Sequence, residues 1–181
     1  MESEKPHFDL ISLNAPGVFG FYQPSSWIML ILREPVERPA WLSEIAGSNT
    51  YLLQVLDPNL KEFPETWSIF YIDVRDVALV HVKAAFAPVS AGNQRYLIAG
   101  PGVGTNKMVF PYGVKFNSKV REYLIKHYPG RKVAPLSREA AEENPPQIYD
   151  TSKAIETFGV KFRGFEEVIG DYMEFVFSYE K

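Results

Sequence analysis

Tyr149 and Lys153 stand four residues apart, the spacing at which two side chains share one face of a helix. On such a face a lysine ammonium lowers the pKa of the tyrosine hydroxyl, so that the hydroxyl can shuttle a proton. A serine, Ser137, stands twelve residues upstream of Tyr149, so the sequence offers a serine, a tyrosine and a lysine in the order of a catalytic group. The preceding Pro145-Pro146 forces extended backbone, however, so the helix is predicted to start only after Tyr149. We therefore interpret this pair as a coincidence of sequence.

A second group of ionisable residues comprises Asp73, Arg75, Asp76 and His81. Together they resemble an acid/base cluster, but simpler roles account for each. Asp73 is a good N-cap and Asp76 falls in the first helical turn, where free N–H groups and the helix dipole favour negative charge. His81 is interpreted as a packed or solvent-edge histidine. The sequence therefore gives no catalytic residue, and three histidines at positions 7, 81 and 127 give no metal site.

The glycine-rich run Gly100-Pro101-Gly102-Val103-Gly104 follows a predicted strand, as phosphate-binding loops do. Thr105 stands where the dinucleotide-binding pattern needs its third glycine, and no helix is predicted to start there. The Gly-Lys-Ser/Thr ending of a phosphate loop is also missing from the run. We interpret the run as a plain turn.

One strand-to-helix junction organises the elements around these residues. The apolar run Ile69–Ile72 predicts a short buried strand, and the helix that follows is capped by Asp73 and ends near Phe86, before Pro88. Its apolar residues recur at helical spacing and predict one buried stripe. The predicted stripe consists of Val74, Val77, Ala78, Leu79 and Val82.

The rest of the chain alternates strands and helices. Residues 8–14 and 94–99 are apolar strands, and the first has the continuous apolar character of a strand inside a parallel sheet. Such a strand needs neighbours, so we expect it to belong to a larger sheet. Four further helices are predicted at 50–56, 119–128, 151–158 and 165–179, with residues 21–45 an irregular insertion and 100–113 a loop.

Composition excludes several classes of function. The chain has 181 residues, no cysteine and a net charge of −3, so neither nucleic-acid binding nor a disulfide framework is expected. The longest apolar run, Trp27 to Leu32, is far shorter than the ~20 residues that a membrane span needs. The acidic start Met1–Lys5 is unlike a signal peptide. We expect a soluble, cytoplasmic protein with a sizeable core.

Three segments of the chain resemble the extended short-chain dehydrogenase/reductases, most of all the branch of dihydroflavonol, cinnamoyl-CoA and fungal methylglyoxal reductases. They are Phe8–Asn14 with Val18-Phe19-Gly20, Tyr71–Ala78 with His81, and Asp150–Ala154 with Phe158–Arg163. The second, which carries the Asp-Val-Arg-Asp-Val-Ala signature, is the most specific.

The resemblance implies an α/β fold: an incomplete Rossmann-type fold with the late strands of a parallel sheet and the small C-terminal substrate-binding lobe. Residues 1–181 would be the C-terminal portion of such a reductase. Within it, 8–20 form a sheet strand and a cofactor-side loop, 21–45 an insertion, and 46–181 mixed lobe and sheet elements. The glycine-rich loop and catalytic tyrosine of the family would lie before Met1.

The resemblance further implies NADP(H)-dependent reduction of a small ketone or aldehyde, with NAD as the alternative cofactor. The implied cofactor contacts are Ala15, Pro16, Gly17, Val18 and Ser48. The family has proline where this chain has Ala15 and again where it has Phe21, so the loop departs from the pattern. We expect no turnover by this chain alone, and an uncovered sheet surface that invites self-association. The alternative is a truncated, non-catalytic relative that acts as an interaction module.

Overall fold

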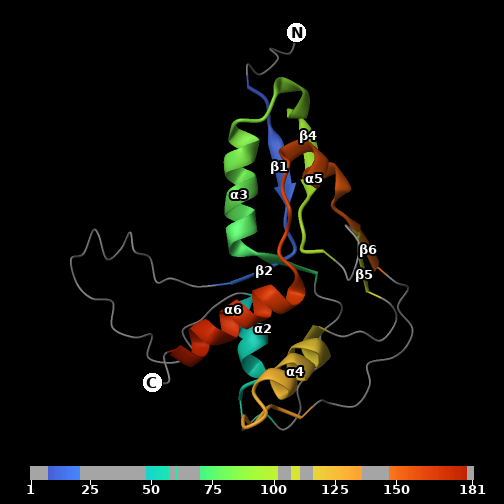
Figure 1. Ribbon diagram of the computed structural model, residues 1–181. Coiled ribbons are helices and arrows are strands. Elements are labelled where there is room, and N and C mark those ends of the chain that lie inside the picture. Colours follow the sequence, from blue (N-terminus) through green and yellow to red (C-terminus); the bar gives the residue numbers. More distant parts are fainter. Residues whose placement is uncertain are drawn as a thin grey trace, which may run out of the picture.

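The computed structural model describes residues 8–20, 48–57, 60, 70–101, 107–110, 116–135 and 147–178. Figure 1 shows these residues in two tiers. The upper tier holds two parallel strands with helices beside them, and the lower tier is a group of helices. The chain passes repeatedly between the tiers, so that neither is one continuous stretch of sequence.

The upper tier is built from a strand–helix–strand unit. Strand β1 (Ile11–Asn14) pairs in parallel with β4 (Gln94–Leu97), with Ile11 opposite Gln94 and Asn14 opposite Leu97. Between them in sequence lies helix α3 (Val74–Ala85). A second parallel pair joins β2 (Gly17–Phe19) to β3 (Tyr71–Asp73). Parallel strands connected through helices confirm the predicted α/β class.

The strand-to-helix junction forms as predicted. The side chain of Asp73 caps α3 by accepting a hydrogen bond from the backbone N–H of Arg75 at 2.7 Å. The helix stops at Ala85, with Phe86 as its C-cap and Pro88 two residues beyond. A short 3-10 turn, η2 (Val89–Ala91), then leads into β4. The cap and the proline therefore set both ends of α3.

The predicted buried stripe of α3 is wrong. The buried residues of this helix are Asp76 and Val80, and Val74, Ala78, Leu79 and Val82 are exposed. Of the five predicted residues, Val77 alone packs against a cluster of buried hydrophobic residues. Both sides of the helix carry apolar residues, so helical spacing alone does not identify the side that meets the core.

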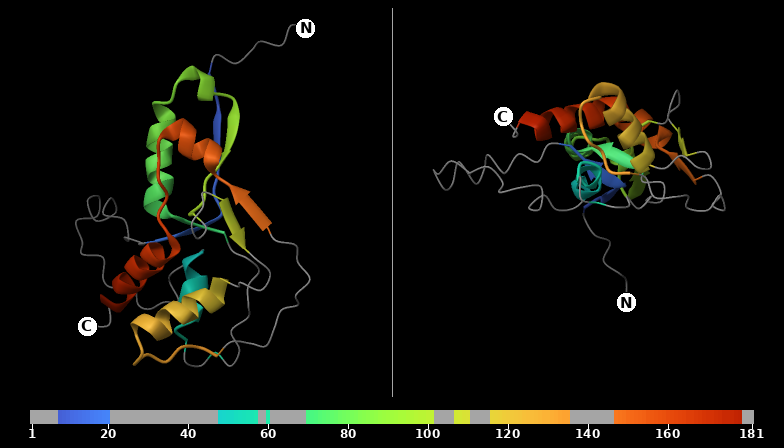
Figure 2. Two further views of the ribbon diagram at one scale, coloured as in Figure 1. Left: turned by 45° about the vertical axis from the view of Figure 1, so that its right-hand side comes forward. Right: turned by 90° about the horizontal axis from the view of Figure 1, so that it is seen from below.

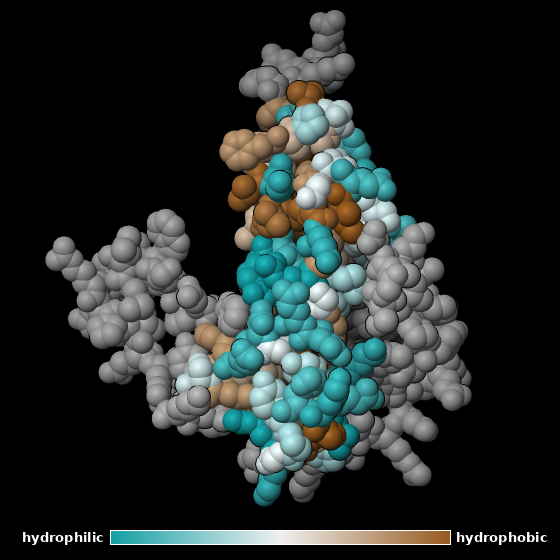
Figure 3. Space-filling view, in the orientation of Figure 1, coloured by the Kyte–Doolittle hydropathy of each residue, from teal (hydrophilic) through white to brown (hydrophobic). Residues whose placement is uncertain are grey.

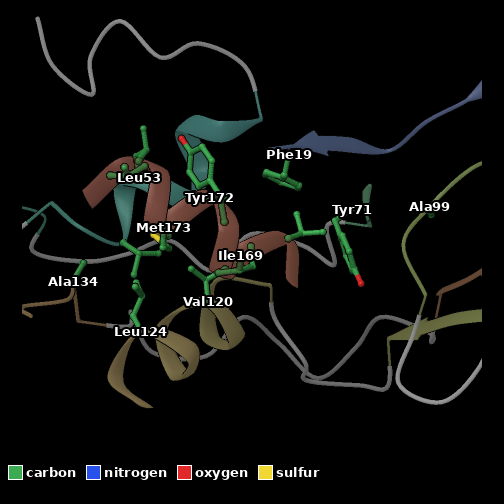
Figure 4. Packing of buried hydrophobic residues seen from close by; sticks show 14 residues of the cluster. Phe19, Leu53, Tyr71, Ala99, Val120, Leu124, Ala134, Ile169, Tyr172 and Met173 are labelled. Atoms are coloured by element: carbon green, nitrogen blue, oxygen red, sulfur yellow. The ribbon is translucent and has the colours of Figure 1, made fainter. Parts of the chain in front are cut away.

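The lower tier packs α2 (Asn49–Gln54), α4 (Phe116–His127) and α6 (Phe165–Ser178) around one group of buried side chains, hereafter the helix cluster (Figure 2). Figure 4 shows Ile169 and Met173 of α6 facing Val120 and Leu124 of α4, while the ring of Tyr172 points away from α4. The full helix cluster is Phe19, Leu52, Leu53, Val55, Tyr71, Ala99, Val120, Leu124, Ala134, Val168, Ile169, Tyr172, Met173 and Val176.

A second group of buried residues, hereafter the sheet cluster, lies under α3 and α5 (Ser152–Phe158) in the upper tier. Helix α5 ends as predicted at Gly159, whose φ of 60° is the left-handed conformation that glycine adopts without strain. The sheet cluster is Ile72, Val80, Ala91, Tyr96, Ile98, Ala154, Phe158, Val160 and Phe162.

Two other predictions need correction. The supposed loop 100–113 contains strand β5 (Lys107–Phe110), which pairs antiparallel with β6 (Gln147–Asp150). Helix α4 starts at Phe116, before the predicted cap at Asn117-Ser118. The predicted insertion at 21–45 lies outside the described residues. Within the described part, no helix has the length and apolar character needed to cross a membrane.

Candidate functional site

The candidate site lies where β1 and β4 end. Because the strands are parallel, their carboxyl ends meet at one edge of the sheet, which is where open α/β folds bind ligands. The carbonyl of Asn14 accepts a hydrogen bond from the backbone N–H of Ile98 at 3.0 Å. This bond continues the pairing of the two chain segments to the last residue of β1. The chain then leaves β1 through Ala15 and Pro16, the first two predicted cofactor contacts.

The far end of this loop is fixed by the second strand pair. The backbone N–H of Gly17 donates to the carbonyl of Phe70 at 3.1 Å, and Gly17 and Val18 lie opposite Tyr71 and Ile72. Ala15 is exposed, and the next three residues are half-buried. The polypeptide is therefore most accessible to a ligand at Ala15 and Pro16, while Gly17 and Val18 are held in the strand pairing.

Tyr149 reaches this same edge. Its hydroxyl donates to the carbonyl of Asn14 at 2.9 Å, and its ring packs on Phe70 with the centroids 4.8 Å apart. Burial raises the pKa of Tyr149, the opposite of what a proton-shuttling tyrosine requires. Sequence reasoning missed this role, since the contact joins residues 135 positions apart. Tyr149 thus positions the loop and is not activated for catalysis.

Lys153 points elsewhere. Its ammonium donates to the carbonyl of Arg95 at 3.2 Å and lies 4.6 Å from the ring centroid of Tyr96. Tyr149 lies in β6 and Lys153 in α5, so the two residues do not share a helix. The prediction that Tyr149 lies outside the helix that carries Lys153 is therefore confirmed.

Ser48, the remaining predicted contact, is half-buried at the start of α2, and its side chain makes no capping hydrogen bond. The next residue, Asn49, donates to the carbonyl of Gly20 at 3.1 Å and accepts from its backbone N–H at 3.3 Å. Ser48 is therefore held near the end of β2. From Gly17 to Gly20 the strand spans about 10 Å, so Ser48 and the exposed Ala15 lie at opposite ends of β2.

The ionisable residues of the junction are structural. Asp73 accepts from Nε and Nη2 of Arg75 at 2.8 and 2.7 Å, and Nη2 also contacts Asp171 of α6 at 2.7 Å. Asp76 accepts from both the backbone N–H and the guanidinium of Arg163. Burial raises the pKa of Asp76, and Arg163 opposes that shift. These pairs connect α3 to the start of α6.

His81 and Gly100 also have structural roles. His81 is exposed, with Nδ1 2.8 Å from the carbonyl of Val77. The backbone N–H of Gly100 donates to the carbonyl of Tyr71 at 2.7 Å, and a Cβ at this glycine would lie 2.3 Å from the Tyr71 ring. Gly100 therefore permits close packing between the strands, while Gly102 to Gly104 lie outside the described residues.

Two curated proteins are similar to this chain in sequence. The ketoreductase azaE of Aspergillus niger is 25% identical over 182 residues, which cover 94% of this chain and 44% of that protein. A putative uncharacterised oxidoreductase of Schizosaccharomyces pombe is 24% identical over 173 residues, covering 96% and 43%. The chain thus spans less than half the length of the curated relatives it matches. Comparison with protein-family models finds no match.

Solved reductases share the fold. Gre2 from Candida albicans superposes with a TM-score of 0.61 at 19% identity, over 99% of this chain and 47% of that one. The yeast methylglyoxal/isovaleraldehyde reductase Gre2, solved with NADPH, gives 0.58 at 20% identity over 96% and 47%. The predicted resemblance to extended short-chain dehydrogenase/reductases is confirmed, and the chain has the fold of about half of such a Rossmann-type reductase.

Proposed function

We propose that this chain is the part of an NADP(H)-dependent carbonyl reductase that carries the nicotinamide-side loop, and that it does not reduce carbonyl compounds without further polypeptide. The observation that carries the proposal is the loop with exposed Ala15 and half-buried Pro16 at the common carboxyl edge of β1 and β4. Sequence similarity to a ketoreductase supports the reaction type. The substrate would be a small ketone or aldehyde.

The described residues fit one end of the cofactor. Ala15 and Pro16 offer backbone at the sheet edge, and the half-buried Ser48 offers a hydroxyl near the end of β2. Bound NADPH would supply a hydride to the carbonyl carbon of the substrate. This chain would orient the nicotinamide end through the loop, while Tyr149 and Gly17 hold the loop through Asn14 and Phe70. We assign no residue of the chain to proton transfer. The lack of cysteine favours a cytoplasmic location.

Titrating the isotopically labelled chain with millimolar NADPH, followed by amide NMR, tests the proposal. A chain that holds only one end of the cofactor binds weakly, and chemical-shift mapping detects weak binding. We expect the largest shifts at Ala15, Gly17 and Val18 and a smaller shift at Ser48. NADH as a second ligand tests the preference for the additional phosphate. Shifts confined to α4 or α6, or no shifts at all, would contradict the proposal.

A kinetic assay is the second test of the proposed function. We expect no NADPH oxidation when the purified chain is mixed with a panel of ketones and aldehydes, because the described part of the chain contains no tyrosine placed for proton transfer. Steady oxidation that Tyr149→Phe abolishes would show that Tyr149 is catalytic after all.

The interaction-module alternative is favoured by one observation, the exposed apolar residues of α3. A module of this kind has no use for NADPH. The same titration therefore separates the two functions.

A further inference from the structure

Helix α3 is apolar on two opposite faces. Val77, Val80 and Ala84 form the inner face and pack in the sheet cluster. A surface helix normally carries polar residues opposite its buried stripe, and a helix that is apolar all round is covered on both sides. The side of α3 away from the sheet cluster, hereafter the outer face, consists of exposed apolar residues with one half-buried arginine among them. These residues are Val74, Arg75, Ala78, Leu79, Val82, Ala85 and Phe86.

The most exposed residues of the outer face point away from the sheet. At about 100° per residue, Val82 lies about 160° around the helix from the buried Val80. Val82 and the C-cap residue Phe86 are 58% and 86% exposed. Figure 3 shows apolar side chains gathered over the upper half of α3. A further helix of the same layer would cover the flank of α3, whereas an occupant of Val82 and Phe86 lies outside that layer.

The outer face has the pattern of one side of a helix–helix contact. In such contacts a side chain of one helix inserts into a hole between four residues of the facing helix, at positions i, i+3, i+4 and i+7. On α3 these positions are held by Arg75, Ala78, Leu79 and Val82, hereafter the α3 hole. The small side chain of Ala78 leaves space between the three larger ones. The outer face therefore carries a hole and also, in Phe86, a large exposed side chain that fits a hole of this kind.

The charge at the α3 hole is already balanced within the chain. The guanidinium of Arg75 contacts the carboxylates of Asp73 and Asp171, each at 2.7 Å. Covering the hole therefore leaves no unpaired charge, and the flat face of a guanidinium accepts an aromatic ring. His81 and Lys83 lie on either side of the outer face, where their side chains stay in contact with water. The electrostatics of the outer face thus permit its burial against an apolar, aromatic surface.

The spacing of these parts makes the outer face complementary to itself. The α3 hole is centred near Ala78, four residues before Val82, and Phe86 stands four residues after Val82. Two antiparallel copies of α3, related by a two-fold axis at Val82, bring Phe86 of each copy to the level of the α3 hole of the other. Contacts about a two-fold axis use one surface twice, and that surface must supply both halves of the contact. The outer face meets this requirement.

We propose that the outer face of α3 is a homodimer interface, in which two α3 helices pack antiparallel about a two-fold axis at Val82 and Phe86 of each copy fills the α3 hole of the other. Together with Val89 of η2, which is 83% exposed, the outer face offers roughly 600 Å² of apolar area. Two copies then bury roughly 1,200 Å², the lower end of the range of stable interfaces, so we expect a dissociation constant of about 10 µM. The inference does not rest on the proposed function, since it uses no residue of the Ala15–Pro16 loop.

Sedimentation equilibrium of the 181-residue chain between about 1 and 300 µM measures the monomer–dimer equilibrium. The decisive variants place a charge on the two-fold axis. Val82→Glu sets two carboxylates against each other and Val82→Lys sets two ammonium groups against each other, so we expect each variant alone to dimerise at least about tenfold more weakly. An equimolar mixture of the two variants should regain the dimer, because unlike charges then meet. Only a residue that faces its own copy gives this result.

Matched variants control for the added charge. Ile125→Glu and Ile125→Lys introduce the same charges on α4, at an exposed apolar residue remote from the proposed axis, and should leave the dimer unchanged. Phe86→Ala empties the α3 hole of the partner copy and should weaken the dimer at least about tenfold. Because Phe86 is exposed in the single chain, this variant should keep the melting temperature of the monomer, and it decides the question if Val82→Glu lowers that temperature.

Three outcomes would overturn the inference. A chain that stays monomeric up to about 300 µM does not use its outer face to bind a second copy. A dimer that Val82→Glu and Phe86→Ala leave intact lies on another face of the molecule. A mixture of Val82→Glu and Val82→Lys that stays monomeric excludes an axis at Val82.

Discussion

The helix cluster and the sheet cluster differ in how completely they are covered. Nine large hydrophobic residues in the described part of the chain are exposed, and eight of them lie on or beside β1, α3, η2 and β4. The ninth, Ile125, lies on α4 at the rim of the helix cluster. The lower tier therefore buries its apolar residues within the chain, whereas the upper tier exposes many of its large apolar residues.

Ion pairs tie the two tiers together. Asp73 and Asp76 are buried at the start of α3, and their partners Arg75 and Arg163 reach toward α6. A buried carboxylate is costly unless it is paired. These contacts therefore hold the upper tier in a fixed position against the lower tier. Breaking them should have the largest effect on the chain.

Arg163→Ala is therefore expected to cost about 3–5 kcal/mol, because it leaves the buried carboxylate of Asp76 without its cationic partner and with the backbone N–H of residue 163 alone. Urea denaturation at pH 7 measures the loss as a lower midpoint. Glu167→Gln is the control, since this carboxylate contacts Arg163 from an exposed position and should change stability by less than about 0.5 kcal/mol. Equal losses in both variants would mean that Asp76 does not need Arg163.

The deficit of Arg163→Ala should shrink at low pH. Burial already raises the pKa of Asp76 above its ordinary 3.8, and Arg163→Ala removes the guanidinium that opposes that shift, leaving the hydrogen bond from the backbone N–H of residue 163. The folded variant then binds a proton more tightly than the unfolded chain, so its stability falls as pH rises from 3.8 through the folded pKa. Midpoints at pH 3.5 and pH 7 test this. A deficit that stays constant would contradict the buried-charge explanation.

A matched pair of leucines compares the two tiers directly. Leu124→Ala removes a fully buried side chain from the helix cluster and should cost about 3 kcal/mol, the typical cost of such a cavity. Leu79→Ala removes an exposed side chain and should cost less than about 0.5 kcal/mol in the chain alone. Denaturation midpoints give both values. A similar cost at both positions would show that the outer face of α3 is already covered within the chain.

Tyr149→Phe is expected to have a smaller effect than Arg163→Ala or Leu124→Ala, about 1 kcal/mol for one hydrogen bond. The carbonyl of Asn14 keeps its bond from Ile98, and the ring keeps its contact with Phe70, so no buried group is left unpaired. Thermal unfolding measures the change. A loss several times larger would mean that Tyr149 organises more of the sheet edge than the Asn14 carbonyl.

Local signals in the sequence predicted much of the fold. The apolar runs located β1 and β4, Asp73 and Pro88 bounded α3, and Gly159 ended α5. Each of these signals acts through neighbouring residues, which is why it can be read without the structure.

The remaining features depend on distant partners. Strand β5 is a strand because β6 pairs with it, about 40 residues later in the chain. The buried face of α3 was misidentified because both faces are apolar, and only the position of the sheet decides between them. The contact of Tyr149 with Asn14 likewise joins β6 to the end of β1. Pattern and spacing carry no information about such contacts.

Native-state hydrogen exchange of the isolated chain tests the contrast between the tiers most directly. If the helix cluster is the complete core, amides of α6 from Val168 to Val176 should exchange only through global unfolding. Amides of β1 and β4 should exchange through local opening, at a free energy lower by about 2 kcal/mol or more. Protection of β1 and β4 equal to that of α6 would contradict this contrast, because the upper tier would then be as stable as the lower tier.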